Sequence, residues 1–250
     1  CALMMGRTGS IGFPHKNIKK VLGRRLFEYP LLASKNSQNI DKIFVTTDCP
    51  VITRVSKKYG AIHIKRPNRL AHSKALGEEV FQHGYFEIKK ILNLDVKHIE
   101  FMILLMANAP TITGKLIDKG INILKKDKNF DSAVTTSIYN MWSPLRARKI
   151  NNKNILIPFV PFKTFGNPKT LNCDRDSQGD VYFADMSVSI IRPYCLENML
   201  CRHENLVSTW EIFMSTHSFM STKVYVDTCS RAEKSMSTRV HCKKLTDADL

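Results

Sequence analysis

The chain has 250 residues, of which 43% are hydrophobic and 24% charged. This is the composition of a globular protein, and it excludes a disordered tail, a collagen-like repeat and a disulfide-dense miniprotein. No apolar run approaches the length of a membrane span, so we expect no membrane-spanning segment.

The charge balance is strongly basic. Lys and Arg number 38 against 22 Asp and Glu, which gives a formal net charge of +16. Such an excess favours an anionic partner, either nucleic acid, a nucleotide, an acidic sugar or a membrane surface. The basic residues are spread along the chain, however, and fit a lysine-rich protein with solvated faces equally well. We do not expect nucleic acid, because the sequence contains no helix-turn-helix, zinc-finger or aromatic RNA-binding motif.

The cysteines predict neither zinc nor disulfides. There are 7, an odd number, and no two have the C-x-x-C spacing. We therefore expect reduced thiols in a cytoplasmic protein. The chain begins at Cys1 inside an apolar segment, and we expect a few residues to precede it.

Apolar runs and turn signals alternate along residues 1–140 and predict strands and helices in turn. Repeated strand–helix–strand units of this length imply an α/β fold with a mostly parallel sheet and helices on both faces. The expected strands are Ala2–Met5, Lys42–Thr47, Ile62–Lys65, His98–Leu105 and Asp131–Tyr139. The expected helices are Leu26–Lys35, Pro50–Tyr59, Gly77–Leu92 and one that Thr113 caps.

Polar segments follow several of these strands. They come after Met5, Thr47, Lys65 and Leu105, in each case just past the end of a strand. In such folds ligands bind at the carboxyl ends of the strands. The sequence therefore predicts one nucleotide-sized site at this edge of the sheet.

The pattern changes in the second half of the chain. Prolines and aromatic residues interrupt Trp142–Asp180, which we expect to be a loop-rich insertion with short β pieces. Tyr182–Arg192 then resumes as a strand. We divide the chain into a nucleotide-binding α/β core at 1–140, an insertion at 141–181, and a return to the core sheet with a diverged C-terminal segment at 182–250.

The first loop, GRTGSIGFPHKN, suits a phosphate group. Its glycines allow the backbone to approach an anion closely. Arg7 and Lys16 supply positive charge, and Ser10 supplies a hydroxyl donor. The loop is neither a Walker A motif nor a dinucleotide fingerprint. On its own, a glycine-rich segment after the first strand fits a simple tight turn equally well.

Several motifs together are more specific. R-x-G-S-x-G-x-x-x-K-N after the first strand resembles the N-terminal motif of the acylneuraminate cytidylyltransferases. The resemblance continues through FVTTD at Phe44–Asp48, the pair Arg66-Pro67, LLMANAPTIT at Leu104–Thr113 and DSAV at Asp131–Val134. It covers roughly residues 1–200, in the right order and spacing.

This resemblance implies a Rossmann-like α/β fold of the nucleotide-diphospho-sugar transferase type, with a small insertion arm that serves for dimerisation. It also implies an enzyme that activates an α-keto sugar acid with CTP, giving a CMP-sugar and pyrophosphate, with Mg²⁺ as cofactor. The sugar would be a nonulosonic acid such as a sialic, legionaminic or pseudaminic acid. The expected partners are therefore CTP, an acidic sugar and a second copy of the chain.

The family motifs assign roles to individual residues. Arg7 and Lys16 match its phosphate-contacting positions and are the expected catalytic residues, because phosphoryl transfer depends on neutralising charge. The expected nucleotide-binding residues are Gly9, Ser10, Gly12, Asn17, Arg66 and Asn108. The expected substrate-binding residues are Arg146, Arg148, Arg175, Gln178 and Asp185. For Arg146 and Arg148, a solvated or interface arginine is an equal alternative.

Two positions depart from the family pattern. Ile11 stands where the family has a lysine, and the late D-x-D segment that holds Mg²⁺ is not found. Asp227 is the weak candidate that remains for the metal, although a hard-cation site needs several carboxylates on one edge. These departures leave a non-catalytic relative that binds a nucleotide or a protein as one alternative. A cytidylyltransferase for an octulosonate-type acid is the other.

Overall fold

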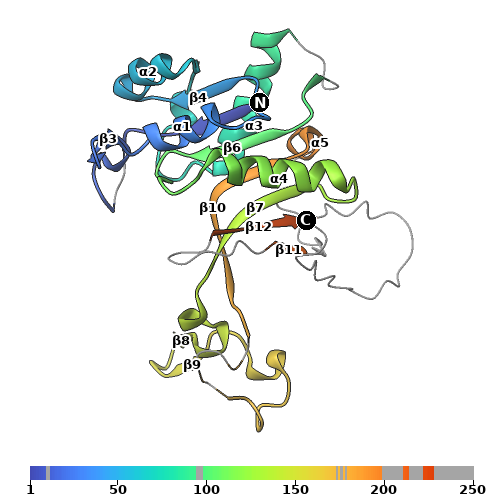
Figure 1. Ribbon diagram of the computed structural model, residues 1–250. Helices are drawn as coiled ribbons and strands as arrows, with labels where there is room; N and C mark the ends of the chain where they lie inside the picture. The colour runs from blue at the N-terminus through green and yellow to red at the C-terminus, as the bar shows by residue number, and fades with distance from the viewer. Residues whose placement is uncertain are drawn as a thin grey trace. The chain divides into compact units, whose positions relative to one another are not determined.

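The computed structural model describes residues 1–9, 12–93, 98–172, 174, 177, 179–198, 211–213 and 222–227. It divides into two compact units (Figure 1). The core unit comprises Cys1–Thr135, Met186–Met214 and Val224–Leu250, and the second unit comprises Thr136–Asp185 and Ser215–Lys223. None of the helices in the described part of the chain is long and apolar enough to cross a membrane.

Parallel strands form the centre of the core unit. β1 (Ala2–Met5) pairs in parallel with β4 (Ile43–Thr47) on one side and with β6 (Met102–Met106) on the other. β4 pairs in parallel with β5 (Ile62–Lys65). The predicted Rossmann-like α/β fold with a mostly parallel sheet is confirmed.

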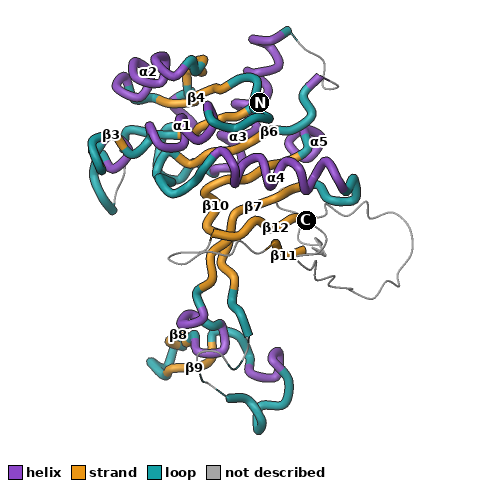
Figure 2. The backbone as a smooth tube through the Cα atoms, in the orientation of Figure 1, coloured by secondary structure: helices purple, strands orange, loops and turns teal. Residues whose placement is uncertain are grey.

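The rest of the sheet differs from a simple parallel arrangement. Its strand order is β11-β12-β7-β10-β6-β1-β4-β5, and the strands not yet introduced are β7 (Ser132–Ile138), β10 (Tyr182–Ile191), β11 (Glu211–Phe213) and β12 (Thr222–Asp227). β10 pairs antiparallel with β6 and so separates β6 from β7 (Figure 2). The chain leaves the core unit along β7 and returns along β10.

Helices cover both faces of the parallel strands, because alternate side chains of a strand point to opposite faces. Ala2 and Met4 of β1 belong to a buried cluster with α1 (Glu28–Lys35), α2 (Pro50–Ser56) and α4 (Gly114–Lys126). Leu3 and Met5 belong to a second cluster with α3 (Gly77–Leu92) and α5 (Pro193–Glu197). Both layers are thus built on β1, which lies in the middle of the parallel strands.

Short elements complete the core unit. Three-residue 3-10 helices occur at η1 (Lys16–Ile18), η2 (Lys57–Tyr59) and η3 (Asn68–Leu70). β2 (Lys20–Val21) and β3 (Arg24–Arg25) form a small antiparallel hairpin.

Two predicted elements begin at least two residues later than expected, and backbone hydrogen bonds explain both. α1 begins at Glu28 instead of Leu26, because the N–H groups of Leu26 and Phe27 donate to carbonyls of the preceding loop. β6 begins at Met102 instead of His98, because its partner β1 begins only at Ala2, which pairs with Ile103.

The predicted helix Pro50–Tyr59 also changes character along its length. α2 ends at Ser56 and the chain continues as the 3-10 turn η2. Gly60 then stops the turn with φ at 79°, a left-handed conformation that glycine adopts without strain.

The second unit contains only short elements in its described part. β8 (Arg148–Ile150) and β9 (Leu156–Pro158) form an antiparallel hairpin. The 3-10 helices are η5 (Asn140–Trp142), η6 (Pro144–Arg146) and η7 (Phe162–Phe165). The unit exposes large apolar side chains, including Trp142 at 69%, Leu156 at 67% and Phe159 at 59%.

Candidate functional site

The topology of the core unit defines one place where a ligand is expected. The chain runs outward from β1 through β4 to β5, and then returns to place β6 on the other side of β1. Ligands of such sheets bind beyond the carboxyl ends of the strands at this reversal. Met5 ends β1 and Met106 ends β6, and both line a cavity of about 540 Å³, here called the switch-point cavity.

The switch-point cavity draws its lining from separate segments of the core unit. These are the loop after β1, Arg66 after β5, the segment that leads into α3, and Asn108 after β6. The predicted residues that the structure brings together around it are Arg7, Gly12, Lys16, Asn17, Arg66 and Asn108. Gly9 is exposed in the same loop but is not part of the lining, and Ser10 lies outside the described residues.

Asn17 fixes the shape of the loop after β1. Its side chain is buried, and its Nδ2 donates to the carbonyl oxygen of Arg7 at 3.2 Å. Its own backbone oxygen accepts from the N–H of Phe27 at 3.1 Å. The Oδ1 atom of Asn17 is buried and has no hydrogen-bond partner among the described residues. This orphaned acceptor is available to an N–H or O–H group of a ligand.

Two further contacts hold the loop against the sheet. The N–H of Thr8 donates to Oδ1 of Asp48, just past the end of β4, at 2.9 Å. Gly6 lies so close to its neighbours that an added Cβ would come within 3.0 Å of the Cβ of Ala107 and 3.1 Å of Ile52. Glycine therefore permits the close approach of this loop to α2 and to the end of β6.

Arg66 is a buried cation in the cavity wall. Its exposed fraction is 6%, and its Nη2 donates to the carbonyl oxygen of Thr46 at 2.9 Å. Its Nε has no hydrogen-bond partner in the part of the chain that the structure describes. Burial lowers the pKa of Arg66, with Asp48 opposing this change and Arg7 adding to it. The protein supplies few partners for the buried positive charge of this guanidinium, and the charge therefore favours the binding of an anion.

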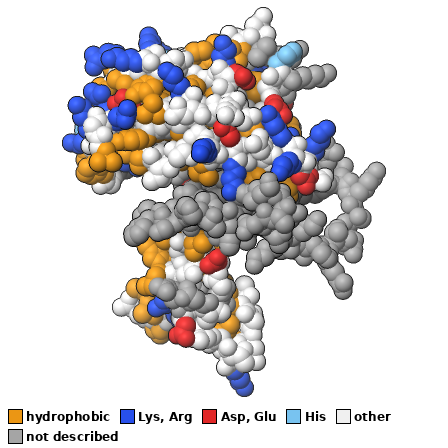
Figure 3. All heavy atoms as spheres, in the orientation of Figure 1, with side chains coloured by type: hydrophobic (Ala, Val, Ile, Leu, Met, Phe, Trp, Pro, Cys, Tyr) orange, Lys and Arg blue, Asp and Glu red, His pale blue; other side chains and the backbone are white. Residues whose placement is uncertain are grey.

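The cavity is cationic on one part of its wall and apolar on another. Arg7, Lys16 and Arg66 supply fixed positive charge, and no residue of its described lining is Asp or Glu. Leu70 and Val80 add apolar surface. Clustered cations beside apolar surface suit a ligand that combines phosphate groups with a flat ring system. In Figure 3, Lys and Arg side chains are also spread over the visible face of the core unit.

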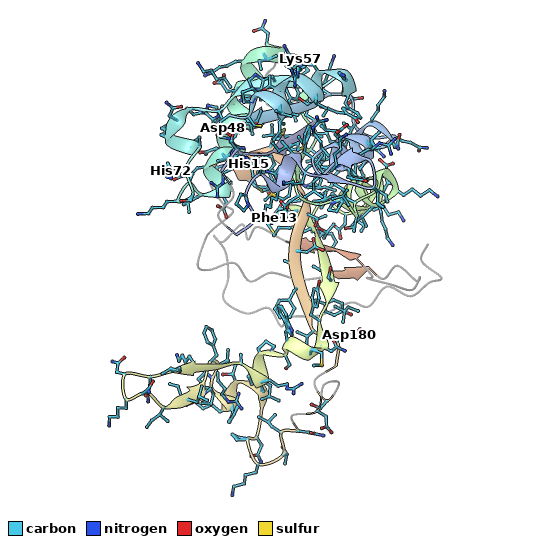
Figure 4. All side chains as sticks on the ribbon, turned by 90° about the vertical axis from the view of Figure 1, so that its left-hand side faces the viewer. Phe13, His15, Asp48, Lys57, His72 and Asp180 are labelled. Carbon is cyan, nitrogen blue, oxygen red and sulfur yellow. The ribbon has the colours of Figure 1, made fainter. Side chains whose placement is uncertain are left out.

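Sequence reasoning missed the segment between β5 and α3. Leu70, His72 and Ala75 of this segment line the cavity, and so do Gly77 at the start of α3 and Phe13 of the first loop. Figure 4 shows Phe13 and His72 on the same side of the core unit as Asp48. The polar stretch after β5 pointed to this part of the chain, but no charge pattern within it singles out these residues.

A family model described as cytidylyltransferase matches residues 1–153 of the chain. The chain belongs to the cytidylyltransferase family. Its match spans the segments that form the switch-point cavity, from the loop after β1 to Asn108.

Curated relatives in this family carry related names. This chain is 26% identical over 152 residues to the pseudaminic acid cytidylyltransferase and UDP-2,4-diacetamido-2,4,6-trideoxy-beta-L-altropyranose hydrolase of Helicobacter pylori. It is 33% identical over 83 residues to the N-acylneuraminate cytidylyltransferase of Escherichia coli. These matches cover 60% and 33% of this chain, but only 28% and 20% of the two relatives. The resemblance that the sequence motifs indicated is thereby confirmed.

A solved structure shows the same fold at low identity. CMP:2-keto-3-deoxy-manno-octonic acid synthetase, complexed with CTP, matches with a TM-score of 0.55 and 15% identity. The match covers 82% of the cytidylyltransferase chain and 78% of the synthetase chain.

The residues predicted for the sugar acid belong to the second unit or are not described. Arg146 is exposed at the end of η6. Arg148 donates to the carbonyl oxygens of residues 145 and 147, and its guanidinium lies 4.9 Å from the ring centre of Phe162. Asp185 accepts from Oγ of Ser137 at 2.9 Å. Arg175 and Gln178 lie outside the described residues, and the substrate-binding role of the whole set stays a prediction.

The described residues do not fit a Mg²⁺ site. Mg²⁺ prefers carboxylate oxygens, and the described lining of the switch-point cavity has none. Nor do the described residues contain any group of three or more His, Cys, Asp or Glu side chains that could hold a metal ion. Asp227 is the last residue of β12, and its side chain is not among those described. The Mg²⁺ requirement therefore stays a prediction.

Proposed function

We propose that the switch-point cavity binds CTP, and that the protein uses it to activate an α-keto sugar acid of the nonulosonic class as its CMP derivative. The observation that carries this proposal is the convergence of Arg7, Lys16 and Arg66 at the reversal point of the sheet, in a chain of the cytidylyltransferase family. The names of the relatives, a pseudaminic acid and an N-acylneuraminate cytidylyltransferase, support the substrate class.

The proposed reaction is an in-line displacement at phosphorus. The anomeric hydroxyl oxygen of the sugar acid forms a bond to the α-phosphorus of CTP and gives up its proton to water. The bond from that phosphorus to the oxygen that bridges the α- and β-phosphates breaks, and pyrophosphate leaves. Negative charge grows on the leaving group, so catalysis depends mainly on positioning and on neutralising charge. Arg7 and Lys16 would take this role from the loop after β1.

Other residues of the cavity would hold the nucleoside. The orphaned Oδ1 of Asn17 can accept a hydrogen bond, and the unpartnered Nε of Arg66 can donate one. Gly12 and the rest of the first loop would approach the phosphates through the backbone, and Asn108 would border the sugar and the base. The proposal thus assigns a task to each predicted nucleotide-binding residue that lines the cavity.

The proposal also covers how the sugar acid is bound and which part of the chain forms a dimer. The carboxylate of the sugar acid needs a cation, and Arg146 and Arg148 are the proposed partners. The exposed apolar side chains of the second unit, Trp142, Leu156 and Phe159, support a role for this unit in pairing two copies of the chain. A cytoplasmic location and Mg²⁺ as cofactor stay predictions.

One observation favours a second candidate function. The described lining of the cavity has no carboxylate to hold a metal ion, which fits a protein that binds CTP without turning it over. The two candidates differ in a single measurable step, the release of pyrophosphate.

The test is pyrophosphate release by the 250-residue chain with Mg²⁺, CTP and, in turn, sialic, legionaminic, pseudaminic and octulosonic acids. The proposal expects release that depends on both CTP and one nonulosonic acid, and that Lys16→Ala reduces. Release with the octulosonic acid alone would replace the substrate class. Binding of CTP without release by any acid would establish the non-catalytic candidate.

A further inference from the structure

A second cavity, of about 510 Å³, lies at the outer edge of the parallel strands. Its lining comes from the end of β4, from α2 and η2, and from β5 with the residues that follow it. We call it the edge cavity. Apart from Arg66, none of its described lining residues was assigned a role from the family motifs, and Arg66 is also the one described residue that it shares with the switch-point cavity.

The edge cavity gathers cations that the rest of the described chain leaves unpaired. Arg54, Lys57 and Lys65 line it and are exposed, and their side chains form no ion pair or hydrogen bond with another described residue. The buried Arg66 adds a further positive charge. Figure 4 views the core unit from the side on which Lys57 and Asp48 lie.

The negative charge in the described lining is small by comparison. Asp48 is the one carboxylate there, and one of its oxygens already accepts the N–H of Thr8. Four cationic side chains facing one carboxylate repel one another, and an anionic ligand would remove that repulsion.

The edge cavity also offers neutral hydrogen-bond donors. Oγ1 of Thr47 accepts from the N–H of Cys49 at 3.0 Å, so its own proton is free to donate to a ligand. Asn68 brings an amide group to the lining. Cations together with hydroxyl and amide donors are the groups that bind phosphate oxygens.

We propose that the edge cavity binds a diphosphate group, at a site distinct from the switch-point cavity. A diphosphate carries about three negative charges near neutral pH, which matches the excess of cations over carboxylate in the lining. The group could come from free pyrophosphate or from a nucleoside diphosphate, because both present the same oxygens. The proposal does not depend on the proposed function, since it concerns binding alone.

Calorimetric titration of the intact chain with inorganic pyrophosphate tests the proposal. Lys16→Ala serves as the background, because loss of this cation from the lining is expected to weaken anion binding in the switch-point cavity. The test variant adds Lys57→Ala and Lys65→Ala, and the matched control instead adds Lys42→Ala and Lys58→Ala. All four of these lysines are exposed, and the control pair lines neither cavity.

At constant ionic strength the test pair should weaken pyrophosphate binding by at least about tenfold, since each removed ammonium group loses a charge-assisted hydrogen bond. The control pair removes the same net charge and should change the affinity by about twofold or less. Equal weakening by both pairs would overturn the proposal, as would the absence of pyrophosphate binding in the Lys16→Ala background.

Two further arms complete the design. Titration with CDP identifies the source of the group: pyrophosphate binding without CDP binding points to the free anion, and CDP binding that the test pair weakens points to a nucleotide. If the test pair fails to fold, Arg54→Gln replaces it, with the same expected loss of affinity. Failure of the CTP turnover assay leaves these outcomes unchanged, so the two proposals are tested separately.

Discussion

Replacing Arg66 by methionine should separate binding from stability. Arg66 is 6% exposed, and its buried Nε is without a partner among the described residues. It also forms no ion pair with a described carboxylate, and burial lowers its pKa. The charge of Arg66 should therefore contribute little to the free energy of unfolding. Binding of an anionic ligand such as CTP should depend on it.

The magnitude follows from the contacts of the side chain. Arg66→Met removes the hydrogen bond to the carbonyl oxygen of Thr46, which contributes about 1 kcal/mol. That oxygen still accepts from the N–H of Gly6 at 3.3 Å, so no buried carbonyl is left unpaired. For buried ion pairs, exchange for well-packed apolar side chains of similar volume is often neutral or stabilising by about 1–4 kcal/mol, and we apply this range to the buried charge of Arg66. After the lost hydrogen bond is subtracted, we expect the free energy of unfolding to change by between about −1 and +3 kcal/mol.

Affinity for CTP should change in the opposite direction. Loss of one charge-assisted contact corresponds to about 1.5–3 kcal/mol, or a tenfold or greater rise in Kd. Urea denaturation and CTP titration of the same preparation measure both quantities. Arg69→Met, an exposed neighbour outside the switch-point cavity, is the control and should alter neither. A destabilised Arg66→Met variant with unchanged CTP affinity would refute the reasoning.

Three further substitutions test the structure. One concerns the loop after β1, and the other two concern the packing of α4 against the loop 36–39. Lys16→Ala should weaken CTP binding at least about tenfold and leave the circular dichroism spectrum unchanged. The control Lys19→Ala, at an exposed position, should leave CTP binding unchanged. Equal CTP affinities of the two variants would contradict the role of the loop in binding phosphate. Asp118→Asn should lower the free energy of unfolding by about 1–2 kcal/mol at neutral pH, because the carboxylate accepts hydrogen bonds from the loop 36–39. Burial raises the pKa of Asp118, but these hydrogen bonds lower it more. The stabilisation by the carboxylate is therefore complete above about pH 5 and is lost as the pH falls below about 4. An Asp118→Asn variant whose stability depends on acid pH in the same way as that of wild type would exclude this account. Gly114→Ala should lower the free energy of unfolding by about 2 kcal/mol, since an added Cβ would lie 2.6 Å from backbone atoms of the loop 36–39. Thermal unfolding measures the change, and a Tm equal to that of wild type would show that the loop moves to accommodate the methyl group.

The sequence predicts best where local signals decide the structure. Gly77–Leu92 forms a helix with the predicted bounds, and Thr113 caps α4 by accepting from the N–H of Leu116. The antiparallel insertion of β10 between β6 and β7 was not predictable in this way. Strand order depends on pairings between residues far apart in the chain, which hydrophobic periodicity does not encode.

The same distinction applies to the site. Arg7 and Lys16 could be selected because they lie in the loop after the first strand and carry a charge suited to phosphate, and Arg66 because the family resemblance indicated it. His72 and Phe13 could not be selected by charge pattern, since their presence in the lining depends on how the loops fold back over the sheet. The edge cavity escaped notice for a similar reason, because its lysines come from separate elements and look solvated in sequence.

A crystal structure of the chain grown with CTP tests the central claim most directly. The account predicts the triphosphate in the switch-point cavity, within hydrogen-bond distance of Arg7 and Lys16, and the base or ribose beside Asn17 and Arg66. CTP bound elsewhere on the core unit, with these side chains unchanged and free of ligand, would contradict it.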